Sequence, residues 1–183
     1  MTNEYWKTTL VLIRHGQARS SDGTYGVETP LSVLGHRQAA ALADELSARK
    51  ATTAVYTSPF LRAVQTSAPI CERIGLEAIV DERLAEFVLE GYPPEEILQQ
   101  RPDLLVWRPE HRAVEEGETI GEFSARVAAF CDDVVERHRN ESVLVVSHAG
   151  TTEAILRWSL GLAPDTLWQH EFNVSNGSIT GLE

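Results

Sequence analysis

Cysteine is scarce in this chain of 183 residues, occurring only at Cys71 and Cys131. Both positions fall on the apolar sides of predicted helices, so we expect buried, reduced thiols and not a disulfide framework. Reduced thiols are typical of a cytoplasmic protein, which is the location we expect. No CxxC pair and no cluster of cysteine and histidine indicates a metal site, so no metal is expected.

Long apolar runs and an excess of basic residues are also missing. No uninterrupted apolar stretch approaches the length of a membrane span, and residues 1–9 lack the apolar core of a signal peptide. The chain carries 16 Lys and Arg against 27 Asp and Glu, a net charge of −11. We therefore expect no membrane and no nucleic acid as partner. A small phosphorylated ligand is still compatible, because a local arginine pocket can oppose the global field.

Apolar strands alternate with amphipathic helices along the chain, which favours an α/β fold. We expect a single domain over residues 1–183, folded as a three-layer α/β/α sandwich around a mainly parallel sheet. Nothing in the sequence decides its oligomeric state. The predicted strands cover residues 8–13, 54–57, 77–80 and 142–146, with a terminal hairpin of residues 171–174 and 178–182 around Asn176-Gly177.

Capping residues mark the ends of the predicted helices. Helices are expected over residues 31–49 and 151–160. Between them, Ser58 is predicted as the N-cap of a helix that Gly75 ends. Thr119 then opens another helix through a Thr-x-x-Glu capping box.

A less regular segment, at about residues 84–118, is predicted to be a lid-like insertion over the site and not a separate domain. It contains Trp107, Arg108 and His111, which combine a large aromatic ring with cationic side chains. These side chains either cover a small subsidiary core or line the entrance for the substrate. The second interpretation has a precedent, because functional segments often lie over a rigid crevice.

Cations and imidazoles follow three of the predicted strands. Arg14, His15 and Gly16 end the first strand, Arg62 lies in the first helical turn after the second, and His148 follows the strand at 142–146. Open α/β sheets bind ligands at the carboxyl ends of their strands, so these side chains should converge. Arginine matches phosphate oxygens with planar, permanently charged donors. The sequence therefore predicts a site for a phosphoryl group.

A leaving alkoxide needs a proton, so we looked for a carboxylic acid near this edge of the sheet. Glu86 follows the third strand and is the best candidate by position. Glu90 and Glu118 compete with it. For Glu118 two other roles are open, namely orienting an arginine of the pocket or stabilising the N-terminus of the following helix.

In these motifs the chain resembles the histidine phosphatase superfamily, whose fold is that of phosphoglycerate mutase. The resemblance implies that His15 is a nucleophile that forms a phosphohistidine, and that Arg14, Arg62 and His148 bind phosphate. It further implies that Glu86 acts as acid and then as base, with no cofactor. The motifs occur in the family's order: Arg14-His15-Gly16, Pro30-Leu31-Ser32, Ser58-Pro59-Phe60-Leu61-Arg62-Ala63, Leu84-Ala85-Glu86, Gly117-Glu118-Thr119 and Ser147-His148-Ala149-Gly150.

The first motif departs from the pattern of many mutases and sugar bisphosphatases. Those enzymes continue it as Glu-Thr-x-Trp-Asn, whereas this chain has Gln17-Ala18-Arg19-Ser20-Ser21. Ser21 takes the place of the amide that those enzymes offer to phosphate, and it is our remaining candidate ligand.

We therefore expect a phosphatase that hydrolyses a small phosphomonoester through phosphohistidine. One alternative is a cofactor-dependent phosphoglycerate mutase, and another is an enzyme that hydrolyses phosphohistidine on proteins. A third is a phospholigand-binding protein without catalysis. His15 and Glu86 argue against the third, because binding alone needs neither a nucleophile nor an acid.

Overall fold

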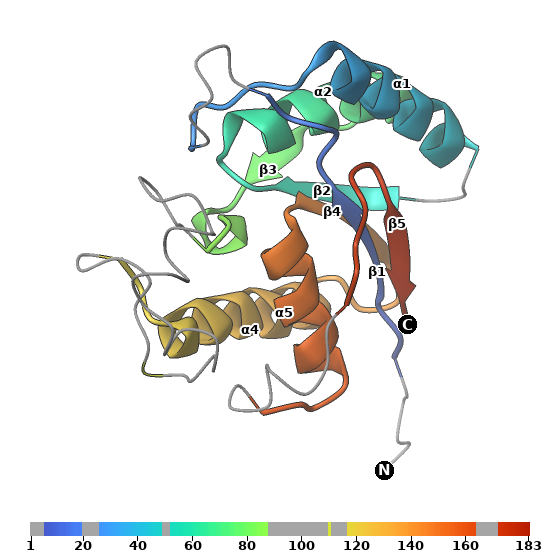
Figure 1. Ribbon diagram of the computed structural model, residues 1–183. Helices are drawn as coiled ribbons and strands as arrows, with labels where there is room; N and C mark the ends of the chain where they lie inside the picture. Colours follow the sequence, from blue (N-terminus) through green and yellow to red (C-terminus); the bar gives the residue numbers. More distant parts are fainter. Residues whose placement is uncertain (1–5, 20–25, 49–51, 88–109, 111–116, 164–171) are drawn as a thin grey trace.

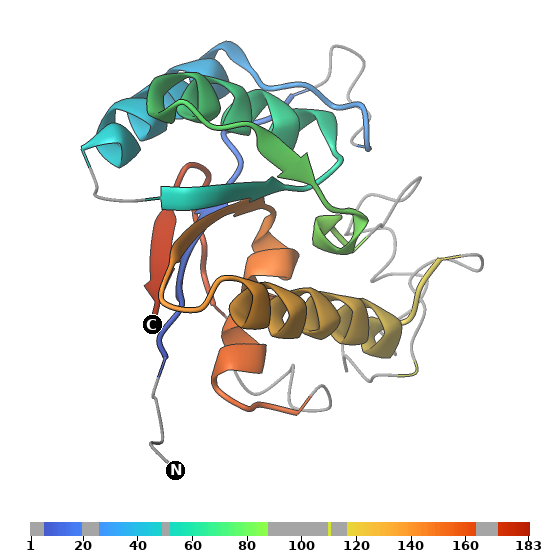
Figure 2. The same ribbon diagram turned by 180° about the vertical axis from the view of Figure 1, so that it is seen from behind.

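A mainly parallel sheet between two layers of helices forms the molecule, which confirms the expected three-layer α/β/α sandwich (Figure 1). Helices α1 and α2 cover one face of the sheet, and α4 and α5 cover the other, as the view from behind also shows (Figure 2). The computed structural model describes residues 6–19, 26–48, 52–87, 110, 117–163 and 172–183.

The sheet has five strands in the order β3-β2-β4-β1-β5. Only β5 runs antiparallel, along the outer edge of β1. The strands span Thr9–Arg14 (β1), Thr52–Thr57 (β2), Ala78–Val80 (β3), Ser142–Ser147 (β4) and Ile179–Leu182 (β5). The helices span Val33–Ser47 (α1), Leu61–Ile74 (α2), Ile120–Arg137 (α4) and Ala149–Ser159 (α5), and a short 3₁₀ helix, η1, spans Glu82–Leu84.

Successive residues of the central strands serve two separate cores. Leu10 and Leu12 of β1 pack into the core beneath α4 and α5, whereas Val11 and Ile13 pack into the core beneath α1 and α2. A strand covered on both faces is expected to be apolar at every position, as residues 10–13 are. The apolar interior therefore fixes the strands rigidly, and their polar carboxyl ends project from it.

The predicted helix ends are correct in two places and wrong in one. Thr119 and Glu122 form the reciprocal capping box, and Gly75 ends α2 in the left-handed conformation with φ of 75°. Ser58, however, is not an N-cap. Helix α2 begins later, at Leu61, with Phe60 as an N-cap that supplies no side-chain hydrogen bond.

The predicted terminal hairpin is also wrong. Residues 172–175 form no strand, and β5 pairs instead with β1. The Asn176-Gly177 turn is present, with φ of 70° at Gly177. Its backbone binds the end of β1, because the Gly177 N–H lies 3.0 Å from the carbonyl oxygen of Arg14 and 3.2 Å from that of His15. The turn thus supports the functional edge of the sheet.

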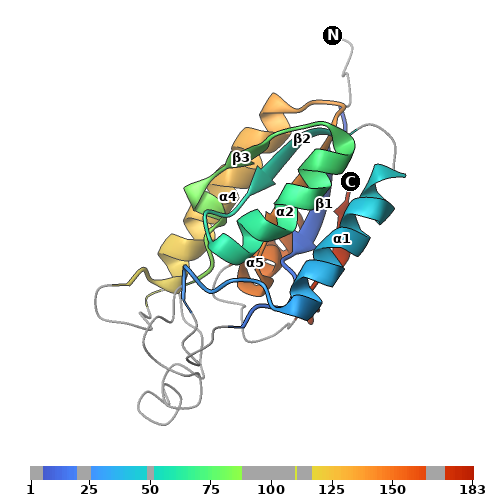
Figure 3. The same ribbon diagram turned by 90° about the horizontal axis from the view of Figure 1, so that it is seen from above.

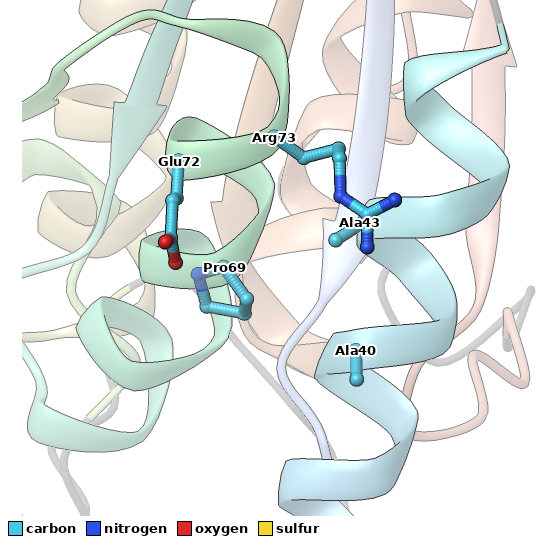
Figure 4. Close-up of a pocket in the computed structure, with 5 residues that line it drawn as sticks. All are labelled: Ala40, Ala43, Pro69, Glu72 and Arg73. Carbon is cyan, nitrogen blue, oxygen red and sulfur yellow. The ribbon is translucent and has the colours of Figure 1, made fainter.

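Helices α1 and α2 lie side by side over the sheet (Figure 3). The outer groove between them is lined by Ala40, Ala43, Pro69, Glu72 and Arg73 (Figure 4). The α2 residues of this groove lie about two turns or more beyond Arg62, so the groove is separate from the predicted site. No described helix has the length and apolarity needed to cross a membrane.

Several predictions concern residues outside the described part of the chain. These include most of the proposed insertion at 84–118, with Trp107, Arg108 and His111, and also Ser21 and Glu90. The insertion and the roles of these residues stay predictions.

Candidate active site

The carboxyl edge of the sheet brings the predicted imidazoles and guanidiniums together. His15 directly follows β1, His148 directly follows β4, and Arg62 is the second residue of α2. The two imidazole rings meet edge to face with centroids 5.0 Å apart. Three segments that are far apart in the sequence thus form one polar cluster, as the strand-end argument predicts.

The hydrogen bonds of His15 define which ring nitrogen carries its proton. Nδ1 lies 2.7 Å from the carbonyl oxygen of Gly16, which can only accept, so Nδ1 is the protonated nitrogen. Nε2 accepts a hydrogen bond of 3.1 Å from Nε of Arg62 and therefore presents a lone pair. Burial, with the charges of Arg62 and Arg14, lowers the pKa of His15 to about 3 despite the Gly16 carbonyl. The ring is a neutral imidazole, able to act as a nucleophile.

Two glycines and a threonine position the backbone that follows His15. A Cβ on Gly16 would lie 2.6 Å from the carbonyl oxygen of Gly35, so no larger residue fits at this contact. The Gly16 N–H donates to Oγ1 of Thr66 at 3.1 Å, and that hydroxyl donates to the Arg62 carbonyl at 2.7 Å. These contacts connect the loop that follows His15 to the first turn of α2.

The two predicted phosphate-binding arginines are both held by backbone carbonyls. Arg62 is buried; one terminal nitrogen donates to the Gly26 carbonyl at 2.8 Å, and its guanidinium lies over the Phe60 ring. Arg14 donates to the carbonyl of Val174. Its Nε is buried, and none of the described residues accepts a hydrogen bond from it. An unused donor beside a neutral imidazole suits an anionic ligand.

His148 is almost completely buried, and its imidazole ring makes one hydrogen bond within the described part of the chain. Its Nε2 lies 2.7 Å from the hydroxyl oxygen of Ser58, and its Nδ1 is buried without a partner there. Burial, followed by the positive charge of Arg62, holds the pKa of His148 well below its ordinary value. This second imidazole is therefore also neutral at pH 7.

Glu86 lies against the N-terminus of α5, where unpaired backbone N–H groups point at its carboxylate. It accepts from Gly150 at 2.9 Å, from Phe87 at 3.0 Å and from Thr151 at 3.1 Å. Burial raises the pKa of Glu86, although these N–H groups and the charge of Arg62 oppose the shift. A Cβ on Gly150 would lie 2.7 Å from a Glu86 oxygen, so the glycine makes room for the carboxylate.

Glu118 does not contact Glu86 directly but is connected to the backbone before it through Arg126. Its carboxylate receives two hydrogen bonds from Arg126 of α4, at 2.5 and 2.7 Å. Arg126 also donates to the carbonyls of Arg83 and Ala85, at 2.8 and 2.9 Å. Glu118 thus orients an arginine, but one that holds the backbone next to Glu86 and not one beside His15.

Sequence reasoning missed two contacts of the site. Asn176, predicted only as part of a turn, donates its side-chain amide to the His15 carbonyl at 3.1 Å. Ser58, predicted as a helix cap, contacts His148 instead. The Asn-Gly turn signal located Asn176, but no local pattern indicates that this turn folds back onto β1.

Comparison with known proteins identifies the family of the chain. The family model described as histidine phosphatase superfamily (branch 1) matches residues 10–183. Two curated relatives come from Hydrogenobacter thermophilus. Phosphoserine phosphatase 1 is 33% identical, with 95% of this chain and 86% of that protein covered, and putative phosphoserine phosphatase 2 is 31% identical, with 93% and 87% covered.

A solved structure shows the same architecture. It is the mycobacterial glucosyl-3-phosphoglycerate phosphatase Rv2419c in complex with VO3, which superposes with a TM-score of 0.81 at 29% sequence identity. The match covers 96% of this chain and 90% of the other. Family match, sequence relatives and fold agree, and the chain belongs to the histidine phosphatase superfamily, branch 1.

Proposed function

We propose that this protein hydrolyses a small phosphomonoester through a phosphohistidine formed on Nε2 of His15. A hydrolase of the histidine phosphatase kind is what its family membership and its phosphatase-named relatives support. The observation that carries the proposal is the state of His15. Its Nδ1–H donates to the Gly16 carbonyl, its pKa is lowered to about 3, and the lone pair of Nε2 is directed at Arg62, from which it accepts a hydrogen bond. This is the state that a nucleophilic imidazole requires at neutral pH.

Arg14, Arg62 and His148 would bind the phosphoryl oxygens. The Nε of Arg14 and Nδ1 of His148 are buried donor positions without partners among the described residues. Arg62 would exchange its hydrogen bond to His15 for one to the phosphoryl group as that group approaches Nε2. Fixed cations and N–H donors stabilise the charge of the transferring group without reorganising, which is the main source of catalysis in phosphoryl transfer.

Glu86 would move the protons of both half-reactions. In the first, the His15 lone pair forms the N–P bond, the ester P–O bond breaks, and Glu86 protonates the departing alkoxide. In the second, Glu86 takes a proton from water, the oxygen of that water forms the new P–O bond, and the N–P bond breaks. The raised pKa of Glu86 favours the protonated acid that the first step needs.

The names of the relatives point to phosphomonoesters of small hydroxy acids. Phosphoserine carries a carboxylate close to its phosphate, and so does glucosyl-3-phosphoglycerate. We propose a substrate of this size and chemistry, used in the cytoplasm. Trp107, Arg108 and His111 stay candidates for contacts with the alcohol part of the substrate, and Ser21 stays a candidate phosphate ligand.

A panel of phosphomonoesters tests this function. It should contain phosphoserine, 3-phosphoglycerate, glucosyl-3-phosphoglycerate, sugar phosphates and p-nitrophenyl phosphate, with released phosphate measured for wild type and His15→Ala. We expect release from at least one hydroxy-acid ester by the wild type and none by His15→Ala. Interconversion of phosphoglycerates without release would identify a mutase instead. Binding without turnover of any compound would identify a phospholigand-binding protein.

A further inference from the structure

Ser58 lies in the interior of the site, although it makes none of the contacts expected of a helix cap. It follows β2 directly and is fully buried. Its hydroxyl oxygen lies 2.7 Å from Nε2 of His148 and accepts a weaker hydrogen bond of 3.3 Å from the Phe60 N–H. Within the described residues, the His148 ring is the only group in hydrogen-bond contact with the Ser58 hydroxyl that could accept its proton.

This contact determines where the proton of His148 lies. If Nε2 were protonated, it would donate to Ser58, and the hydroxyl proton of Ser58 would be buried with no acceptor. The Nδ1 lone pair would be unpaired as well, so two buried groups would be unsatisfied. In the opposite arrangement Ser58 donates, Nε2 accepts, and the Nδ1–H is the one group left without a partner among the described residues, so this arrangement is favoured. A neutral imidazole has one N–H, which must then be on Nδ1. Nδ1 is the buried nitrogen that has no partner among the described residues.

We propose that Ser58 is a positioning residue, whose hydroxyl fixes the proton of His148 on Nδ1 so that this N–H can bind the phosphoryl group. The inference rests on the proposed function, in which His148 is a phosphate ligand. It explains how the neutral imidazole of His148 can bind an anion beside Arg14 and Arg62. With the other tautomer, Nδ1 would present a lone pair, which a phosphoryl oxygen repels.

The tautomer of the wild-type protein is the first measurement. Long-range proton–nitrogen NMR correlations of protein labelled with ¹⁵N-histidine distinguish an Nδ1–H ring from an Nε2–H ring. The His148 signals are identified by their loss in His148→Asn. We expect Nδ1–H at pH 7. An Nε2–H ring would overturn the proposal without using any Ser58 variant, and it would leave the role of His15 untouched.

Substitution then tests what the hydroxyl does. Ser58→Ala should convert His148 to a mixture of tautomers and weaken inorganic phosphate binding by about 10- to 100-fold, the range for losing a hydrogen bond to a charged group. Ser147→Ala is the matched control, because the Ser147 hydroxyl is also buried, is adjacent to His148 and has no partner among the described residues. It should change neither the tautomer nor the affinity.

Ser58→Ala with the wild-type tautomer and wild-type affinity would overturn the proposal. A changed tautomer with unchanged phosphate affinity would overturn it too, because the Nδ1 proton would then not serve the anion. A failure of the proposed function would be seen in a different experiment, in which the wild type forms no phosphorylated His15.

Discussion

At the scale of single residues, the site depends on two buried imidazoles that are neutral for the same reason but serve different purposes. Burial and neighbouring guanidinium groups lower the pKa of both His15 and His148. In His15, the Nδ1–H donates to the Gly16 carbonyl, which leaves a lone pair on Nε2 for the proposed attack. In His148, by our proposal, the contact with Ser58 leaves the N–H of Nδ1 for binding. In the proposed mechanism the same chemical group would thus act as nucleophile or as ligand according to its hydrogen-bond partners.

Glu86→Gln should separate substrates by their leaving groups. An alkoxide needs a proton to depart, so an alkyl phosphate should lose about 10²–10⁴-fold in rate. The phosphorylation step with p-nitrophenyl phosphate should slow far less, because that phenolate leaves unaided. Water activation is still impaired, so rapid-quench assays should show a burst followed by slow turnover. Equal losses on both substrates in single-turnover experiments would assign the acid role elsewhere, and the exposed Glu82→Gln provides a control without loss.

Gly150→Ala should displace the Glu86 carboxylate without changing Glu86 itself. The new methyl would lie 2.7 Å from a Glu86 oxygen, so the carboxylate must move away from the N–H groups of α5. We expect reduced turnover of alkyl phosphates with little change in melting temperature, because only the end of a side chain has to shift. The control is Gly181→Ala, where a Cβ meets nothing within 4 Å. Wild-type kinetics in Gly150→Ala would show that Glu86 is not needed at this position.

At the scale of elements, α4 supports Glu86, the proposed acid, although none of the proposed phosphate ligands lies on this helix. Arg126 of this helix is oriented by Glu118 and binds the carbonyls of Arg83 and Ala85, directly before Glu86. The first residues of α5 then receive the carboxylate itself. Glu86 is thus held between two helices, as the precision of proton transfer requires.

Arg126→Ala should therefore reduce turnover of alkyl phosphates by about 10- to 100-fold, because a small misplacement of a catalytic group is costly. The phosphorylation step with an aryl phosphate should be affected less. Arg137→Ala is the control on the same helix, since Arg137 is exposed and pairs only with Asp133 among the described residues. Equal losses on both substrates with a lowered melting temperature would show that Arg126 merely stabilises the fold.

At the scale of the whole molecule, the buried imidazoles couple stability to pH. The pKa of His15 is about 3 in the folded protein and near 6.5 in the unfolded chain. Between these values the unfolded chain binds a proton that the native state excludes. The free energy of unfolding should therefore fall as the pH falls from about 6.5 towards 3, and His15 adds no further loss below that.

Urea unfolding at several pH values measures this effect. His15→Gln removes the titrating group, so its free energy of unfolding should depend less steeply on pH between 6.5 and 4 than that of the wild type. Identical slopes in the two proteins would mean that folding leaves the pKa of His15 near its ordinary value, against the lowered pKa on which the proposed nucleophile rests.

The sequence predicts the architecture and most of the site because both follow from short-range patterns. Residues 10–13 read as a buried strand, and the polar residues after such strands must meet at one edge of the sheet. The errors concern contacts between distant segments. Ser58 has the local signature of a cap but bonds to His148, 90 residues away. Residues 179–182 alternate like a hairpin strand but pair with the open edge of β1, a partner that local sequence cannot reveal.

The central claim is that His15 carries the phosphoryl group, and trapping that intermediate tests it most directly. Wild-type protein mixed with ³²P-labelled substrate and quenched within one turnover should carry label that is acid-labile and base-stable, as expected of a phosphoramidate. His15→Ala should carry none while keeping the wild-type melting profile. Equal label on His15→Ala, or wild-type turnover with only acid-stable label, would contradict the account.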